Sequence, residues 1–169
     1  MEIAELYELK LNQPQEAIRV YEKALELNEG SKRIFGKLLP LYEQVEDWGS
    51  TVQLLMHFAN IEPDAATKAK YYFAIGALQR DHINDHLQAV RSFDKALEAD
   101  PHMLKAFAAI ETLLTQERNF ERQDRYFRKM LKRANEHNMG ADMVFKLASA
   151  LGEINRSRLS RFQEAIKAY

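Results

Sequence analysis

Two stretches of the sequence decide the fold: residues 17–28 read AIRVYEKALELN, and residues 89–100 read AVRSFDKALEAD. Six of the twelve aligned positions are identical. In both stretches the apolar side chains recur with the period of about 3.6 residues that is typical of an amphipathic α-helix. The chain therefore contains an internal helical repeat, whose shared apolar face carries Ala17, Tyr21, Ala24 and Leu25 in one copy and Ala89, Phe93, Ala96 and Leu97 in the other.

Weaker copies of this pattern occur between and after the two clear ones. Their apolar faces carry Thr51, Leu55 and Phe58, then Gln123, Phe127 and Met130, and finally Ala165 and Tyr169. The five copies begin at residues 17, 51, 89, 123 and 165, so the spacings are 34, 38, 34 and 42. A recurring interval of about 34 residues is long enough for a pair of helices with their turns.

A second amphipathic stretch precedes each copy, and the pattern therefore predicts five helical hairpins. The predicted first helices are 1–11, 31–45, 64–80, 103–117 and 140–157. The predicted second helices are 14–27, 48–61, 86–99, 120–137 and 160–169. Helix-breaking residues separate them, among them Pro14, Gly30, Pro63, Pro101 and Gly140, because proline and glycine interrupt or cap helices. Pro40 lies inside a predicted first helix and predicts a kink there.

In this arrangement the chain resembles the tetratricopeptide repeat family, with about four and a half repeats. The family pattern places aromatic, aliphatic and small residues at fixed slots of the first helix. The matching residues are Ile3, Ala4 and Tyr7, then Phe35, Leu38 and Tyr42, then Tyr72, Ile75 and Gly76, then Phe107, Ile110 and Leu114, and then Leu151 and Gly152. The fourth repeat departs most from the pattern, since Glu111 and Gln123 replace small residues.

The resemblance implies an all-α fold, a right-handed α-solenoid of antiparallel helical hairpins. We expect one domain over residues 1–169, with repeats at about 1–30, 31–63, 64–101, 102–138 and 139–169. The alternative is an irregular helical bundle with a chance similarity. Because the sequence stops within a predicted second helix, we also expect a fragment of a longer array.

Composition narrows the class of function. The 24 basic and 25 acidic residues give a net charge of −1, whereas a nucleic-acid-binding domain usually carries a basic excess. The chain has no cysteine and no stretch with the features of a signal peptide, which favours a cytoplasmic location. It contains no phosphate-binding glycine loop and no nucleophile motif, so we predict that it is not an enzyme and needs no cofactor.

Two histidines, His82 and His86, have the i, i+4 spacing that suits a metal on a helix. They fall where the helical pattern breaks, and the sequence supplies no third ligand of the kind a zinc site requires. A polar loop is the preferred interpretation, and no metal site is predicted.

The resemblance predicts a protein-interaction scaffold, because first helices in this family line a concave groove that receives a peptide or partner protein. Four basic residues occupy one equivalent position in these helices: Arg33, Lys70, Lys105 and Lys146. A cation near a helix N-terminus is mildly unfavourable for the helix dipole, so helix stability does not explain them. We predict that this basic row steers an acidic peptide and that Phe73 is an apolar anchor, although generic surface lysine is an open alternative.

Two other functions remain open from the sequence. Helix 120–133 carries a basic stripe of Arg122, Arg125, Lys129 and Lys132, which could bind nucleic acid or another anionic surface. Neutralisation by nearby carboxylates is the preferred interpretation of this stripe. The terminal helices could also mediate self-association into a homo-oligomer.

Overall fold

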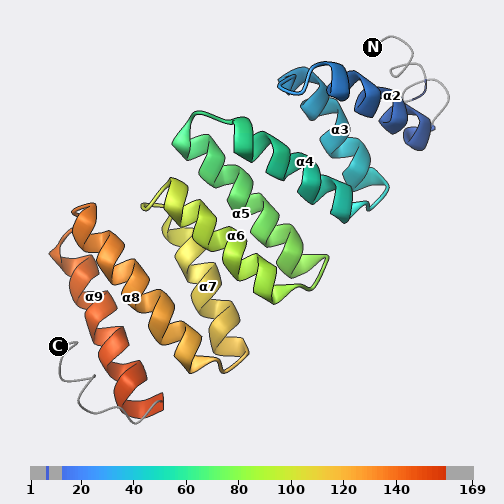
Figure 1. Cartoon of the computed structure of the whole chain (residues 1–169). Helices are drawn as coiled ribbons and strands as arrows, with labels where there is room; N and C mark the ends of the chain where they lie inside the picture. Colours follow the sequence, from blue (N-terminus) through green and yellow to red (C-terminus); the bar gives the residue numbers. More distant parts are fainter. Residues whose placement is uncertain (1–6, 8–12, 159–169) are drawn as a thin grey trace. The chain divides into compact units, whose positions relative to one another are not determined.

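The computed structural model describes residue 7 and residues 13–158 of the chain. These residues form eight α-helices and a closing π-helical turn, with no strand among them (Figure 1). The helices are α2 (Pro14–Leu27), α3 (Lys32–Gln44), α4 (Trp48–Ile61), α5 (Ala65–Asp81), α6 (His86–Ala99), α7 (Leu104–Gln116), α8 (Phe120–Glu136) and α9 (Ala141–Glu153), followed by η1 (Ile154–Arg158). The all-α class is confirmed.

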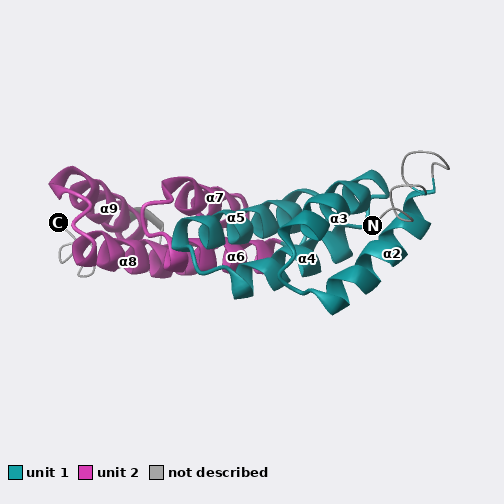
Figure 2. Ribbon diagram, turned by 90° about the horizontal axis from the view of Figure 1, so that it is seen from above, with its two compact units in different colours: residues 1–85 teal, residues 86–169 magenta. Residues whose placement is uncertain are grey.

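The chain divides into two compact units (Figure 2). Unit 1 covers Met1–Asp85 and contains α2 to α5. Unit 2 covers His86–Tyr169 and contains α6 to α9 with η1. The boundary falls inside the third predicted repeat, between its two helices. Within each unit, consecutive helices are joined by short turns and pack against each other.

The helices follow the stretches that the sequence predicts. The predicted second helices 14–27, 48–61 and 86–99 coincide with α2, α4 and α6. The predicted helices 1–11 and 160–169 lie outside the described residues. The stretch 140–157 differs, because α9 ends at Glu153 and the chain continues as a π-helical turn. In that turn the buried Asn155 amide donates to the carbonyl of Leu151 (2.9 Å) and to Asp124 on α8 (2.7 Å).

The two units repeat one local architecture at an interval of 72 residues. Helices α2 and α6 begin at residues 14 and 86, α3 and α7 at 32 and 104, and α4 and α8 at 48 and 120. The turn after α3 has a left-handed residue at Glu46 (φ 55°), and the turn after α7 has one at Arg118 (φ 53°). This matches the left-handed C-terminal cap common in helices. Residue i of unit 1 is therefore equivalent to residue i+72 of unit 2 over these helices.

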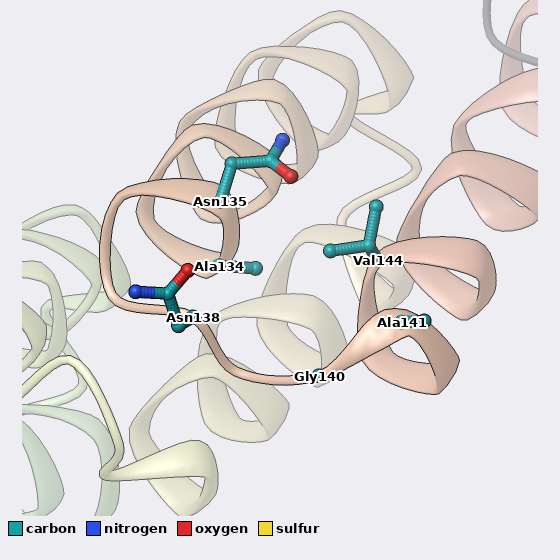
Figure 3. A pocket seen from close by; sticks show the side chains of 6 residues that line it. All are labelled: Ala134, Asn135, Asn138, Gly140, Ala141 and Val144. Carbon is teal, nitrogen blue, oxygen red and sulfur yellow. The ribbon is translucent and has the colours of Figure 1, made fainter.

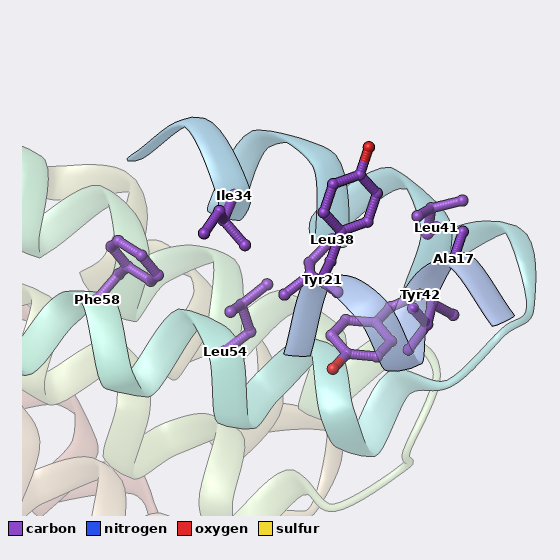
Figure 4. Close-up of a cluster of buried hydrophobic side chains, with 9 residues drawn as sticks. Ala17, Tyr21, Ile34, Leu38, Leu41, Tyr42, Leu54 and Phe58 are labelled. Carbon is purple, nitrogen blue, oxygen red and sulfur yellow. The ribbon is translucent and has the colours of Figure 1, made fainter. Parts of the chain in front are cut away.

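The core of unit 1 is built from the apolar faces that the repeat predicts (Figure 4). Tyr21 of α2, Leu38 of α3 and Phe58 of α4 are all buried, with at most 2% of each residue exposed. Their equivalents in unit 2 are Phe93, Ile110 and Met130, each fully buried. Burial of such side chains stabilises by roughly 1.5–3 kcal/mol each. The repeat signature thus specifies the core of each unit.

Asp47 caps the N-terminus of α4, and its removal is a test of the local structure. The carboxylate accepts a hydrogen bond from the backbone N–H of Ser50 (3.0 Å). We expect Asp47→Ala to lower the free energy of unfolding by about 1 kcal/mol. The bond from Ser50 lowers the pKa of Asp47 below its usual 3.8, so the folded chain binds this proton less readily than the unfolded chain.

The contribution of this cap to the free energy of unfolding is therefore fully present at a pH above the pKa of Asp47 in the unfolded chain. It is lost as the pH falls through the pKa of Asp47 in the folded chain. Urea unfolding of the natural chain and of Asp47→Ala should show a smaller difference at about pH 3 than at about pH 7. An equal difference at the two pH values would contradict the role of the carboxylate.

Candidate functional site

The basic row begins in unit 1 on the first helices α3 and α5. Arg33 is exposed in the first turn of α3, and Lys70 is exposed in the second turn of α5. The rings of Phe35 and Tyr71, which closely follow these two residues, make an edge contact with their centroids 5.6 Å apart. The two helices therefore bring the segments that carry Arg33 and Lys70 together. Phe73 is half-buried, so only part of its ring is available to a ligand.

The row continues in unit 2 on α7 and α9. Lys105 lies in the first turn of α7 and Lys146 in the second turn of α9, and both are exposed. Lys105 is the 72-residue equivalent of Arg33. Each basic residue is thus placed on a first helix with its side chain accessible to solvent. Alignment of all four along one groove stays a prediction.

Among the described residues, two of the four cations of the basic stripe on α8 form ion pairs. Lys129 contacts Asp94 (2.5 Å) and Glu98 (2.9 Å) on α6, and Lys132 contacts Glu136 (3.6 Å) on its own helix. Burial would lower the pKa of Lys129, but the hydrogen bonds to the two carboxylates outweigh that effect and raise it. Within the stripe, Arg125 is exposed and Arg122 is half-buried. Lys129 is thus already committed to two carboxylates of the chain itself.

A second cation, which the sequence reasoning did not single out for a site, completes this arrangement. Arg133 contacts Asp94 (2.8 Å) and lies 3.8 Å from Glu98. Its side chain is only 9% exposed and that of Asp94 is 13% exposed, so the pair is largely removed from water. We call Asp94, Glu98, Lys129 and Arg133 the ion cluster. Its i, i+4 carboxylates on α6 and i, i+4 cations on α8 were the available sequence signal.

A pocket of about 370 Å³ lies at the turn between α8 and α9 in unit 2 (Figure 3). It is lined by small or amide side chains, namely Ala134, Asn135, Asn138, Gly140, Ala141 and Val144. None of these described lining residues titrates, so they offer no acid, base or nucleophile. The pocket therefore provides no support for catalysis.

The two histidines with the i, i+4 spacing, His82 and His86, make other contacts. The ring of His82 stacks on Trp48 in unit 1, with centroids 3.8 Å apart and an angle of 22° between the rings. His86 begins α6 in unit 2 and contacts Glu117 (3.2 Å). Over residue 7 and residues 13–158 there is no group of three side chains that could hold a metal ion. No helix in the same residues is long and apolar enough to cross a membrane.

The chain is similar to known proteins over almost its whole length. A sequence model described as "Tetratricopeptide repeat" matches residues 2–168. No curated protein sequence gives a significant match. Among solved structures, MamA matches 99% of this chain and 91% of its own, with 16% identity and a TM-score of 0.50.

Two further structures match with lower scores. The protein pilF of Pseudomonas aeruginosa has 15% identity and a TM-score of 0.49, over 99% of this chain and 79% of its own. YrrB, a TPR protein with an unusual peptide-binding site, has 14% identity and a TM-score of 0.48, over 99% of this chain and 79% of its own. At these identities the likeness to MamA concerns the fold alone.

Proposed function

The chain belongs to the tetratricopeptide repeat family, and from this premise we propose that its first helices bind an acidic peptide or an acidic segment of a partner protein. Membership of this family supports a general role for the chain as a scaffold for protein–protein interaction. Proteins of this family are typically scaffolds rather than enzymes. Which face binds, and what it binds, must be argued from the residues of this chain.

The observation that carries the proposal is the exposure of a basic residue in the first two turns of four consecutive first helices, at Arg33, Lys70, Lys105 and Lys146. Cations spaced along a repeat surface attract a chain with distributed carboxylates and raise its rate of association. The half-buried Phe73 and Tyr71 lie beside Lys70 on α5 and supply apolar contact area. Such aromatic residues commonly provide most of the binding energy at an interface.

Reversal of three charges of the row tests this proposal. We expect Lys70→Glu, Lys105→Glu and Lys146→Glu together to weaken binding by more than about tenfold, since attraction to carboxylates becomes repulsion. The ligands would be peptides selected from a random displayed library on the natural chain, with dissociation constants measured by fluorescence anisotropy. Selected peptides should be enriched in Asp and Glu.

The matched control reverses three exposed lysines on second helices: Lys23 on α2, Lys95 on α6 and Lys132 on α8. This control changes the net charge by the same amount at a different surface. Equal weakening by the control would show a bulk charge effect, and unchanged affinity in the Lys70, Lys105 and Lys146 variant would overturn the proposal.

A further inference from the structure

A groove of about 430 Å³ lies between the second helices α2 and α4 of unit 1. It is lined by Glu22, Leu25, Glu26, Glu29 and His57, and we call it the acidic groove. No lysine or arginine is among these described lining residues. The ring of His57 contacts the backbone carbonyl oxygen of Glu29 (2.8 Å). Three carboxylates therefore surround a partly apolar space in which the described lining provides no lysine or arginine to balance them.

The position of one carboxylate is fixed from outside the groove. The hydroxyl of Tyr42, a buried residue of α3, donates to Oε1 of Glu22 (2.7 Å). Burial first, and then this bond, raise the pKa of the Tyr42 phenol, so it stays a donor. The bond orients the Glu22 carboxylate, and Glu22 is also one of the residues that line the groove.

The equivalent positions of unit 2 show what such a pair of carboxylates can hold. By the 72-residue register, Glu22 and Glu26 correspond to Asp94 and Glu98 on α6. In unit 2 those two carboxylates bind Lys129 at 2.5 and 2.9 Å, and Asp94 binds Arg133 at 2.8 Å. The same register makes His57 and Ile61 of α4 the equivalents of Lys129 and Arg133. Unit 1 thus has the two carboxylates of the arrangement but neither lysine nor arginine at the positions equivalent to its cations.

We propose that the acidic groove of unit 1 binds a basic helical segment of a partner protein that presents two cations four residues apart. Lys129 and Arg133 have this spacing, and on a helix residues four apart share one face. Leu25 in the groove and Ile61 beside it, which is 47% exposed, would contact the apolar stems of those side chains. The surface is on second helices, and its partner has the opposite charge to the ligand of the basic row.

A peptide with the sequence of α8 is a suitable probe, because it carries the cation pair that unit 2 uses. The fluorescein-labelled 17-residue peptide FERQDRYFRKMLKRANE would be titrated with the full chain at low ionic strength. A second peptide with glutamine at both cation positions keeps the apolar residues and removes the charges. We expect this second peptide to bind on the order of tenfold more weakly, given up to about fivefold for each exposed ion pair.

Variants of the chain locate the binding. Glu22→Gln with Glu26→Gln should weaken binding of the α8 peptide on the order of tenfold, because glutamine keeps the bond from Tyr42 and removes the charge. The control pair Glu43→Gln with Glu111→Gln removes two exposed carboxylates elsewhere and should leave the affinity within about twofold. Equal weakening in both pairs, or in neither, would overturn the proposal.

Filling the groove from within gives a second test that does not remove a carboxylate. His57→Lys with Ile61→Arg places the two cations of unit 2 at the equivalent positions of α4. There they should form ion pairs with the carboxylates of Glu22 and Glu26. This variant should keep the helical circular dichroism of the natural chain. Its affinity for the α8 peptide should be more than about tenfold lower. Retained binding would contradict the proposal. The Lys70, Lys105 and Lys146 reversals should not weaken this peptide, so the two binding proposals fail separately.

Discussion

Phe93→Ala should lower the free energy of unfolding of unit 2 by about 3–5 kcal/mol. Phe93 lies on α6 with none of its surface exposed. Truncation removes the transfer free energy of the ring and leaves a cavity that the neighbouring helices cannot fully close. Phe93 belongs to the clearest copy of the repeat, so this is also the most direct test of the fold.

The matched control is the same change at Phe145 on α9, where the residue is 71% exposed. Phe145→Ala leaves no buried cavity, and we expect a loss of less than about 1 kcal/mol. Equal losses at the two positions would contradict the burial of Phe93. Both variants lie in unit 2, so the comparison does not depend on how the units interact.

Urea unfolding followed by two probes provides the measurement. Far-ultraviolet circular dichroism reports helices in both units, whereas the single tryptophan, Trp48, reports unit 1. Repeat proteins can unfold in segments, since each repeat contacts mainly its neighbours. If the units unfold separately, Phe93→Ala should lower the urea midpoint of the part of the circular dichroism signal that comes from unit 2. The midpoint of the Trp48 fluorescence transition should then stay unchanged. A parallel shift in Trp48 fluorescence would show that the units unfold together.

The helices and the core could be predicted from the sequence because their signals are local. The period of apolar residues through Tyr21 and Phe93 defines buried faces, and Pro63 or Gly140 separates one helix from the next. The 34-residue spacing then assigns each helix to a hairpin. Even Gln123, which departs from the repeat pattern, is accommodated without loss of register: it is buried, and its amide donates to Thr115 (3.0 Å).

The ion cluster could not be predicted in the same way. Asp94 and Arg133 are 39 residues apart, and their contact depends on which faces of α6 and α8 meet. The sequence shows Lys129 as part of a basic stripe with acidic neighbours on its own helix, but its strongest partners lie on another helix. The turn at Asn155 has a similar origin, since its buried amide bonds to Asp124 on α8. Such polar contacts need the packed arrangement as well as the helical period.

Asp94→Ala should lower the free energy of unfolding by about 2–4 kcal/mol, because it leaves a buried guanidinium without its nearest carboxylate. Of its two carboxylate partners among the described residues, Arg133 would retain Glu98, at 3.8 Å, while Lys129 is 41% exposed and can turn toward water. Glu22→Gln, at the equivalent position of unit 1, strands no lysine or arginine among the described lining residues of the acidic groove. Its expected cost is below about 1 kcal/mol.

A second substitution separates the cost of a stranded charge from the value of the ion pair itself. In Asp94→Ala with Arg133→Leu, no guanidinium is buried, and we expect more than half of the lost free energy to return. Urea unfolding of the single and double variants measures this recovery. A double variant less stable than Asp94→Ala would contradict the cost assigned to the stranded guanidinium, because Arg133 would then stabilise the fold even without Asp94. Recovery would instead show that most of the loss in Asp94→Ala comes from the stranded guanidinium, a cost that unit 1 does not carry, because no lysine or arginine is among the described lining residues of the acidic groove.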